Sequence, residues 1–345
     1  MRFLWILMLL PGLAFAQGFA GLGNAPQDGF ATPERGVSLS FPADHGSHPD
    51  YRIEWWYLTA NMTGPDGTQY GAQWTLFRSA LDVGERPDWD SPQIWMAHAA
   101  LTSADQHFVA EKFARGGIGQ AGVVAQPFEA WIDDWQMSGP TLNNVTVQAS
   151  GQGFSYALDL RADAPFTLQG DAGYSVKSAA GQASYYYSQP FYDLSGVIEV
   201  EGVQVPVTGQ AWLDREWSSQ PLAETQTGWD WFSLQLDGGE RVMAFRLRDE
   251  AGQPFHSGTW IAADGTVQPL ANDALLLTPL AIGQSVGPEL PVEWRVQVPS
   301  RGLDVTTTAL NVDSWMGTLF PYWEGPIRIE GSHSGVGYLE MTGYD

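Results

Sequence analysis

The stretch Gly209-Gln210-Ala211-Trp212-Leu213-Asp214-Arg215-Glu216-Trp217 carries the strongest fold signal in the chain. It begins with the small and aromatic residues of a β-strand and continues with three charged residues in a row. Because strand side chains alternate between two faces, Trp212, Asp214 and Glu216 should share one face and the residues between them the other. Buried charge must be paired or take part in chemistry. Asp214 is therefore either a structural partner of Arg215 or Arg78, or a chemically active acid.

Strand patterns of the same kind fill the rest of the chain. Residues 51–60 and 70–78 flank a Gly-Pro-Asp-Gly turn at 64–67, which predicts a β-hairpin. Further strands are predicted at 94–102, 108–113, 128–135, 141–149 and 154–161. Short strands with turn signals about every ten residues are typical of a sandwich or a barrel. No amphipathic helix longer than about two turns is expected.

The chain also contains an internal repeat. Four segments recur in the same order: 55–57 with 229–232, 154–160 with 292–298, 191–198 with 322–329, and 209–214 with 335–340. The repeat indicates two related β units joined near residues 218–227. Closure into a barrel removes sheet edges, and a barrel of about eight strands can hold one small ligand. We therefore predict an all-β protein of two antiparallel β-barrels, at residues 37–220 and 221–345.

Composition limits the possible partners. The formal charge of −23 disfavours binding to nucleic acid or to an anionic membrane surface. The chain has no cysteine, which excludes disulfides, thiolate metal sites, a cysteine nucleophile and a lipid attached to cysteine. Aromatic residues make up 13% of the chain, with 16 tryptophans, and suit both β cores and the walls of a ligand site.

The N-terminus resembles a secretory signal peptide. Arg2 precedes an apolar run at residues 3–13, and Ala14-Phe15-Ala16 matches a small-residue cleavage site. We expect cleavage after Ala16, a flexible lead-in at residues 17–36, and a secreted or periplasmic protein; an uncleaved anchor is the alternative. No later segment is long enough for a membrane-spanning helix, so the cleaved protein is not expected to be integral to a membrane.

Two further motifs point to no metal and no cofactor. The loop at residues 42–50 carries His45 and His48 beside Asp44 and Asp50, but lacks the helix or the additional ligands of a metal signature. Residues 117–122 match G-x-G-x-x-G, yet they lie in a β-rich region without a βαβ unit, so we interpret them as a glycine-rich loop.

The residues Glu54-Trp55-Trp56-Tyr57, Trp95-Met96-Ala97-His98 and 212–217 resemble the AttH/CrtC lipocalin-like family. The resemblance covers about residues 37–344. The family includes carotenoid 1,2-hydratase, and fungal lipocalin-like cyclases are similar. Around the acidic strand the hydratases have G-x-G-Y-x-D-x-N-W; Asp214 and Trp217 match this motif and Glu216 replaces its Asn. The resemblance is closer to the secreted AttH branch, and it implies two tandem lipocalin-like (calycin-type) barrels.

The resemblance implies a small apolar ligand, such as an isoprenoid or another lipid. One function is an enzyme, a hydro-lyase that adds water to a carbon–carbon double bond; the alternative is a carrier without chemistry. A purely structural role would leave the first barrel filled with side chains. The catalytic candidates are Asp214, Glu216, Glu54 and His98. The candidate ligand-binding residues are aromatic: Trp55, Trp56, Tyr57, Trp95, Tyr186, Tyr192, Trp212 and Trp217.

Several of these candidates could instead have a purely structural role. Glu54 would form a salt bridge with Arg52 or Arg78. His98, in an alanine-rich strand, would be a hydrogen-bonded core residue, although its near-neutral pKa suits proton transfer. The tyrosines at 185–187 and Tyr192 would be packed on the barrel rim rather than lining a mouth. Only an enzyme requires an acid of raised pKa inside an aromatic pocket.

Overall fold

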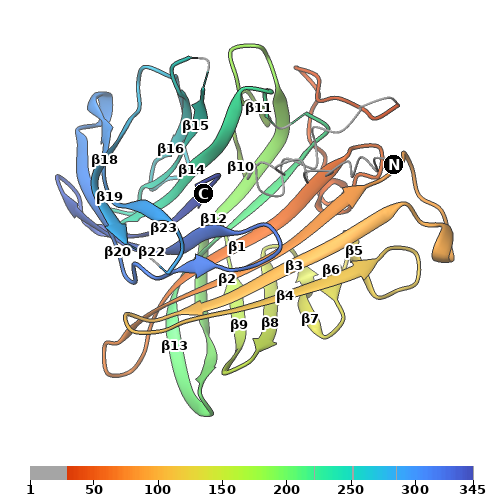
Figure 1. Cartoon of the computed structure of the whole chain (residues 1–345), viewed down its shortest axis with the longest axis horizontal. Helices are drawn as coiled ribbons and strands as arrows, with labels where there is room; N and C mark the ends of the chain where they lie inside the picture. Colours follow the sequence, from red (N-terminus) through yellow and green to blue (C-terminus); the bar gives the residue numbers. More distant parts are fainter. Residues whose placement is uncertain (1–28, 221, 251, 285, 345) are drawn as a thin grey trace, which may run out of the picture.

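Two antiparallel β-sheets form the protein, and they lie against each other (Figure 1). The computed structural model describes residues 29–220, 222–250, 252–284 and 286–344. The predicted signal peptide and residues 17–28 lie outside the described residues, so export stays a prediction. Residues 29–36 contact the first sheet: the backbone N–H of Ala31 donates to the carbonyl of Asp50, and that of Glu34 donates to the Tyr185 hydroxyl.

The first sheet, sheet A, has 13 strands and curls into a nearly closed barrel. Along its main path the order is β4-β3-β2-β1-β13-β12-β9-β8-β7-β6-β5, with β10 and β11 paired to β12. Its strands are β1 (Ile53–Thr63), β2 (Gln69–Ala80), β3 (Gln93–Thr102), β4 (His107–Arg115), β5 (Ala121–Val124), β6 (Phe128–Ile132), β7 (Trp135–Thr141), β8 (Asn144–Gly151), β9 (Phe154–Arg161), β10 (Thr167–Leu168), β11 (Tyr174–Val176), β12 (Ala183–Val200) and β13 (Val203–Ser218).

The second sheet, sheet B, has 10 strands and forms a half-barrel, with the order β17-β16-β15-β14-β23-β22-β20-β19-β18 and β21 paired to β22. Its strands are β14 (Gln226–Leu236), β15 (Arg241–Asp249), β16 (Phe255–Ile261), β17 (Val267–Leu270), β18 (Leu276–Gln284), β19 (Glu289–Val298), β20 (Leu303–Ala309), β21 (Trp315–Met316), β22 (Tyr322–Gly331) and β23 (Gly335–Thr342). The predicted all-β fold of two lipocalin-like barrels is confirmed, with the second barrel only half closed.

Helical structure in the described part of the chain is limited to short 3-10 turns: η2 (Ala43–His45), η3 (Asp88–Asp90) and η4 (Pro299–Arg301). Within the described ranges, none of these is long and apolar enough to cross a membrane.

The two sheets share one topology. In each, the first strand pairs with both the second and the last, so β2-β1-β13-β12-β9-β8 corresponds to β15-β14-β23-β22-β20-β19. Three of the four predicted repeat pairs occupy equivalent strands in this scheme. The fourth differs: residues 154–160 lie in β9, whose counterpart is β20, whereas 292–298 lie in β19. Both are alternating apolar strands, so the sequence pattern alone does not distinguish neighbours.

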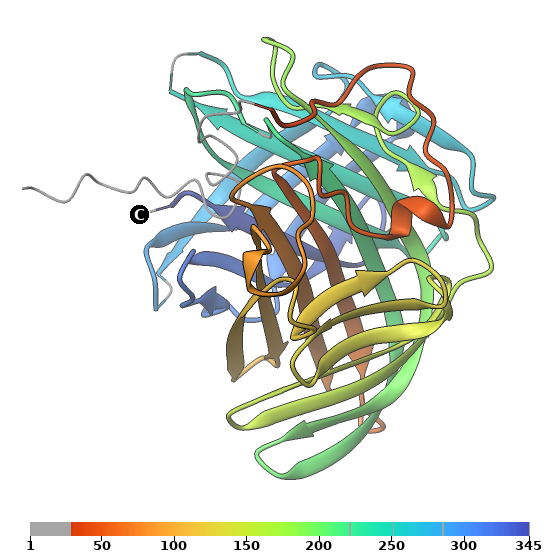
Figure 2. The same cartoon turned by 90° about the vertical axis from the view of Figure 1, so that its right-hand side faces the viewer.

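Two local features also differ from the sequence prediction. The single strand expected at 128–135 is two strands, because Asp133 adopts a positive φ of 53° at a tight turn and the chain reverses before Trp135. The glycine-rich segment at 117–122 is a loop, as expected, but its end begins the edge strand β5. Figure 2 shows strands β5 to β8, in yellow, curving round the barrel, and the long β12–β13 hairpin, in green, extending past them.

The interior of sheet A is filled by side chains rather than open to a ligand. Trp56, Trp74 and Trp135 are at most 1% exposed, and they belong to one buried cluster that continues through β6 to β9. A charged group is enclosed with them: the Glu54 carboxylate binds both Arg78 and Arg215. Sheet B contains the same arrangement of charges, in which Asp230 forms salt bridges with Arg246 and Arg248. Each sheet thus encloses one carboxylate between two arginines.

The outer faces of the central strands of both sheets pack on each other. A third buried cluster joins Tyr57, Tyr186 and Trp212 of sheet A to Trp231 and Phe245 of sheet B. The two sheets pack tightly at Gly71 of β2, where an added Cβ would lie 2.6 Å from the Cγ of Pro326 in β22. The candidate site described next lies within this contact between the sheets.

Candidate functional site

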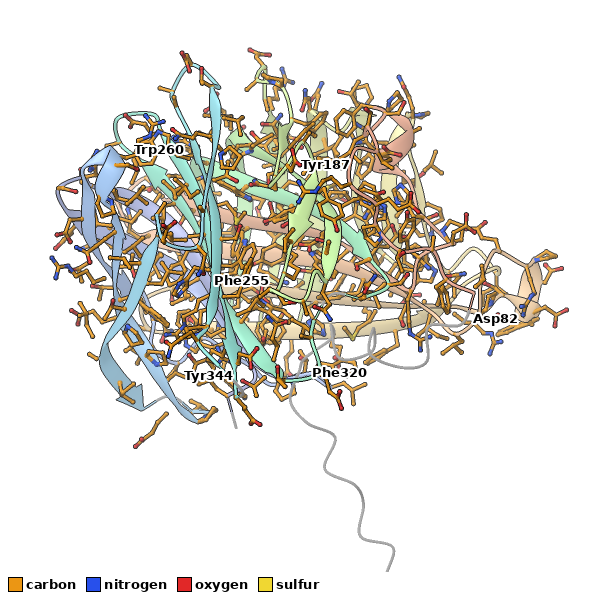
Figure 3. All side chains as sticks on the ribbon, turned by 90° about the horizontal axis from the view of Figure 1, so that it is seen from above. Asp82, Tyr187, Phe255, Trp260, Phe320 and Tyr344 are labelled. Atoms are coloured by element: carbon orange, nitrogen blue, oxygen red, sulfur yellow. The ribbon has the colours of Figure 1, made fainter. Side chains whose placement is uncertain are left out.

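A cavity lies between the two sheets, and its walls come from both. Sheet A contributes residues of β1, β2, β3, β12 and β13, and sheet B contributes residues of β14, β15, β22 and β23. The empty space between them, including its opening to solvent, is about 890 Å³. Most of the wall is aromatic, and the partly exposed Phe320 lies at the edge of the molecule, on the same side as Tyr344 (Figure 3). A mostly apolar wall with few polar groups is the usual form of a small-molecule site.

Asp214 lines this cavity and is 2% exposed. Its Oδ2 accepts a hydrogen bond from the Tyr186 hydroxyl at 2.5 Å, and its Oδ1 accepts from the Trp212 Nε1 at 2.7 Å and from Ser188. Burial raises the pKa of Asp214 to about 7, although these hydrogen bonds act against the rise. Within the described residues it has no ion pair, because Arg215 and Arg78 both bind Glu54 on the opposite face of the strands. A substantial share of Asp214 is thus neutral near pH 7.

Glu216 lies two residues further along β13, on the same face and in the same cavity. Its Oε1 is 2.7 Å from the Nζ of Lys177 and accepts a hydrogen bond from Ser184. The Lys177 ammonium also lies over the rings of Tyr186 and Phe245, at 4.8 and 4.5 Å from their centroids. Lys177 and Glu216 therefore form a buried ion pair in the wall beside Asp214.

The wall from sheet B carries a second acidic group. Glu340 in β23 faces the cavity and accepts a hydrogen bond from the Trp229 Nε1 at 2.9 Å. Glu324 of β22 lies directly opposite it and is 1% exposed. The Tyr57 hydroxyl donates to Glu324 and lies close to Glu340. Glu340 keeps a small exposed area toward the cavity, yet burial among aromatic groups raises its pKa to about 8, with Asp214 and Glu216 adding to the rise.

His98 reaches the cavity from β3 and is hydrogen-bonded on both ring nitrogens. Its Nδ1 is 3.0 Å from the Tyr322 hydroxyl, and its Nε2 is 3.1 Å from the Oε1 of Glu111. Burial lowers the pKa of His98, against the effect of Glu111, so the ring is neutral at pH 7. A neutral ring that donates to Glu111 accepts from Tyr322.

The cavity thus brings together three of the four catalytic candidates, Asp214, Glu216 and His98. Glu54 does not reach it. Its side chain is 0% exposed inside sheet A, where burial would raise its pKa but Arg78 and Arg215 lower it well below the ordinary value. The salt bridge expected between Glu54 and Arg78 is present. Arg215 forms a second salt bridge with the same carboxylate.

The aromatic candidates divide in the same way. Trp55, Tyr57 and Tyr186 line the cavity, and Trp212 lies behind Asp214. The remaining four lie in the packed interior of sheet A, namely Trp56, Trp95, Tyr192 and Trp217. Tyr192 donates to the carbonyl of Leu142, and Trp217 stacks on His48 with ring centroids 4.0 Å apart. These four residues were expected to line a ligand site, but they are packed among other side chains, and the cavity lies between the sheets.

The sequence interpretation missed Glu340, Glu324 and Lys177, together with the aromatic residues of sheet B. The repeat itself held the signal for Glu340, since the match of 209–214 with 335–340 aligns it with Asp214. Lys177 lies in the irregular segment before β12, and no pattern in the sequence connects it with Glu216.

Comparison with known proteins agrees with this architecture. The AttH-like family model matches residues 32–344. The chain belongs to the AttH-like family. A solved structure described as AttH, from Nitrosomonas europaea, is 34% identical, with a TM-score of 0.80 over 92% of this chain and 100% of the other. Among curated proteins, none matches this chain.

Two more distant structures share the fold. Kievitone hydratase from Nectria haematococca is 15% identical, with a TM-score of 0.64 over 92% of this chain and 98% of the other. The structure of CghA with Sch210972 is 12% identical, with a TM-score of 0.54 over 93% of this chain and 97% of the other. At these identities the likeness is one of fold. This member of the AttH-like family therefore shares its double-sheet architecture with a hydratase.

Proposed function

We propose that the protein binds a small apolar molecule between its sheets and adds water to a carbon–carbon double bond of that molecule, with Asp214 as the proton donor. The observation that carries the proposal is the environment of Asp214: a buried carboxyl in an aromatic cavity, without an ion pair within the described residues, and with its pKa raised to about 7. A carboxylic acid can protonate carbon near neutral pH only if it stays neutral there. The shared fold with kievitone hydratase supports the proposal by analogy.

The reaction would proceed in two balanced steps. In the first, the O–H bond of Asp214 breaks, a C–H bond forms at one alkene carbon, and the other carbon becomes a cation beside the new Asp214 carboxylate. In the second, a water oxygen bonds to the cation and the water releases a proton to the carboxyl groups of the cavity, which restores neutral Asp214. The net change is the addition of one water.

The cavity wall is suited to the cationic intermediate. Aromatic faces attract a cation without reacting with it, at about 0.5–2 kcal/mol each in a dry site. Trp55, Tyr57 and Trp231 lie around the position of Asp214 in the cavity. The Lys177–Glu216 pair adds no free positive charge, because the ammonium lies 2.7 Å from the carboxylate.

A carrier without chemistry is the second candidate, and the hydrogen bonds of Asp214 favour it. Tyr186, Ser188 and Trp212 all donate to the carboxyl, and three donors stabilise the ionised form. An ionised Asp214 would be a poor acid, and the cavity would then only hold its ligand.

The variant Asp214→Asn separates the two functions, because it keeps the shape of the side chain and removes the acid. Geraniol, farnesol and retinol serve as probes, with binding followed by tryptophan fluorescence and products by mass spectrometry. We expect a hydrated product from at least one probe, unchanged binding by the variant, and turnover lower by about 10²–10⁴-fold. Asp163→Asn, at an exposed position, is the matched control. Binding without product in the wild-type protein would favour the carrier, and equal turnover by Asp214→Asn would reject Asp214 as the donor.

A further inference from the structure

A row of neighbouring polar side chains, several of them joined by hydrogen bonds, leads from the cavity to the surface on the wall opposite Asp214. At its inner end, Glu340 faces the cavity and lies beside the Tyr57 hydroxyl. Tyr57 in turn donates to Glu324. These three groups come from β23, β1 and β22, so the chain begins where the two sheets meet.

The outer half continues through sheet A. Tyr322 lies two residues before Glu324 in β22 and close enough to affect its pKa, and its hydroxyl is 3.0 Å from the Nδ1 of His98. The Nε2 of His98 is 3.1 Å from Glu111. The Glu111 side chain is 22% exposed, and its Oε1 also accepts the backbone N–H of Leu319 at 3.0 Å. The chain therefore ends at the surface.

Each interior member of this chain can both accept and donate a hydrogen bond. A neutral carboxylic acid, a phenol and a neutral imidazole have this capacity, whereas a carboxylate only accepts and an imidazolium only donates. Burial raises the pKa of Glu324 and of both tyrosines well above their ordinary values, and lowers that of His98. The Oε2 of Glu324 has no partner among the residues that the structure describes, which a neutral acid tolerates better than an anion.

The outer end differs from the interior in its charge. Partial burial would raise the pKa of Glu111, but the hydrogen bonds from His98 and Leu319 lower it below the ordinary value. An ionised, partly exposed carboxylate at the end of a neutral chain can accept a proton and is in contact with solvent. The cross-strand position of Glu324 opposite Glu340 also disfavours ionisation of both at once.

We propose that Glu340 is a second proton-exchanging group of the cavity, and that Tyr57, Glu324, Tyr322 and His98 relay its protons to Glu111 at the surface. A proton that arrives on one oxygen of Glu340 releases another from its hydroxyl to Tyr57, and each later member repeats the shift until Glu111 receives one. No bond to carbon is made or broken in the relay. The inference deepens the proposed function, because it supplies an exit for the proton of a water molecule that attacks from the side opposite Asp214. On this route Asp214 regains its own proton from solvent water through the open side of the cavity, so the net change is still the addition of one water.

Hydrogen–deuterium exchange of the neutral glutamic acids tests the relay without any substrate. Glutamate labelled with ¹³C at the side-chain carboxyl separates the infrared band of these acids from that of Asp214. The wild-type protein near pH 7 should show neutral glutamic acid, and Glu340→Gln should remove part of that band. A spectrum with ionised glutamates alone would overturn the proposal.

The rate of hydrogen–deuterium exchange then tests the route that the protons take. In the Glu340→Gln background, Glu324 is separated from the cavity, so its proton should exchange through Tyr322, His98 and Glu111. Adding Glu111→Gln keeps the size and the acceptor oxygen of the side chain but removes the terminal proton acceptor, and should slow exchange by about tenfold or more. Adding Glu330→Gln instead, at an exposed position of β22, should leave the rate unchanged. Equal rates in the two double variants would overturn the relay.

The exchange experiment tests the relay independently of the proposed hydration reaction. If no probe is turned over by any variant, the exchange rates still decide whether the relay exists. If geraniol, farnesol or retinol is hydrated, Glu340→Gln should lower kcat with little change in binding, and Glu111→Gln should do so to a smaller extent. Turnover that depends on Asp214 but not on Glu340 would reject the second group and leave the first in place.

Discussion

Asp214 and Glu340 occupy equivalent positions in the two sheets, and both face the cavity between them. Asp214 lies in β13 opposite Tyr57 of β1 and Ser188 of β12, whereas Glu340 lies in β23 opposite Trp231 of β14 and Glu324 of β22. The packing of two related sheets on their outer faces thus brings one acid from each repeat to opposite walls of a single cavity. An acid on either side of a ligand is the arrangement needed for donating a proton at one face and removing one at the other.

Asp214→Asn should change the pH dependence of stability. Since burial raises the pKa of Asp214 from 3.8 to about 7, the folded chain holds this proton more tightly than the unfolded chain. Its contribution is fully present below about pH 4 and is lost as the pH rises through about 7. Between about pH 4 and pH 8, the unfolding free energy of the wild type should therefore fall relative to that of Asp214→Asn, by up to about 4 kcal/mol.

Urea unfolding of both proteins across this range measures the difference, with Asp163→Asn as the control for an exposed aspartate. A difference between Asp214→Asn and the wild type that stays constant with pH would show that Asp214 has an ordinary pKa in the folded protein.

The sequence predicts which side chains share a face of a strand, but it does not predict what each face packs against. Trp212, Asp214 and Glu216 do share one face, and Arg215 lies on the other, as period-two alternation requires. A single strand pattern does not say which face meets the barrel interior and which meets a second sheet, because both are buried. Trp56 and Trp217 were for this reason expected in a ligand site, and they lie in the core of sheet A.

The partners of the buried charged side chains could not be predicted from the sequence either. Glu54 was expected either to act in chemistry or to bind an arginine, and its choice depends on Arg78 and Arg215, which come from two different neighbouring strands. The cross-strand register that brings the three together is set by the whole sheet. The relay from Glu340 to Glu111 joins five strands of two sheets, and no local pattern contains it.

Glu54→Ala should be among the most destabilising single substitutions in the chain. It would leave the guanidinium groups of Arg78 and Arg215 buried without their carboxylate, and breaking a buried ion pair in this way costs about 3–5 kcal/mol. Chemical unfolding measures the loss, and Glu330→Ala, at an exposed position of β22, should change stability by no more than about 0.5 kcal/mol.

The pH dependence of the same site has the opposite sign to that of Asp214. The arginines lower the pKa of Glu54 well below 4.5, so its stabilising effect is fully present above about pH 4.5 and is lost as the pH falls through the lowered pKa. The deficit of Glu54→Gln relative to the wild type should accordingly shrink in acid. A deficit that persists unchanged at low pH would mean that packing, and not charge, makes up the loss.

Gly71→Ala should weaken the contact between the sheets. A Cβ at this position would lie 2.6 Å from the Pro326 Cγ and 2.9 Å from the Tyr338 hydroxyl, and a rigid proline ring has little freedom to move away. Overpacking of this kind costs about 1–3 kcal/mol. Gly317→Ala is the matched control, because nothing lies within 4 Å of its added Cβ. Thermal unfolding should show a lower midpoint for Gly71→Ala alone; equal midpoints would mean that the two sheets adjust without cost.

Glu216→Gln should lower the pKa of Asp214. The negative charge of Glu216 is one of the influences that raise the Asp214 pKa, and its loss also frees the Lys177 ammonium from its partner. Both changes favour the ionised form of Asp214, so its pKa should fall by about one unit, and the share of neutral acid near pH 7 should fall with it. Titration of ¹³C-labelled aspartate carboxyls by NMR measures the pKa directly.

The double variant Glu216→Gln with Lys177→Met tests the electrostatic origin of this change. It removes the ammonium as well as the carboxylate, while the methionine side chain can still pack against the rings of Tyr186 and Phe245. The Asp214 pKa should then return most of the way to its wild-type value, and any turnover that depends on neutral Asp214 should return with it. If the pKa stays low in the double variant, the single substitution acted by opening the cavity to water, since better solvation of the carboxylate lowers its pKa without any change in nearby charge.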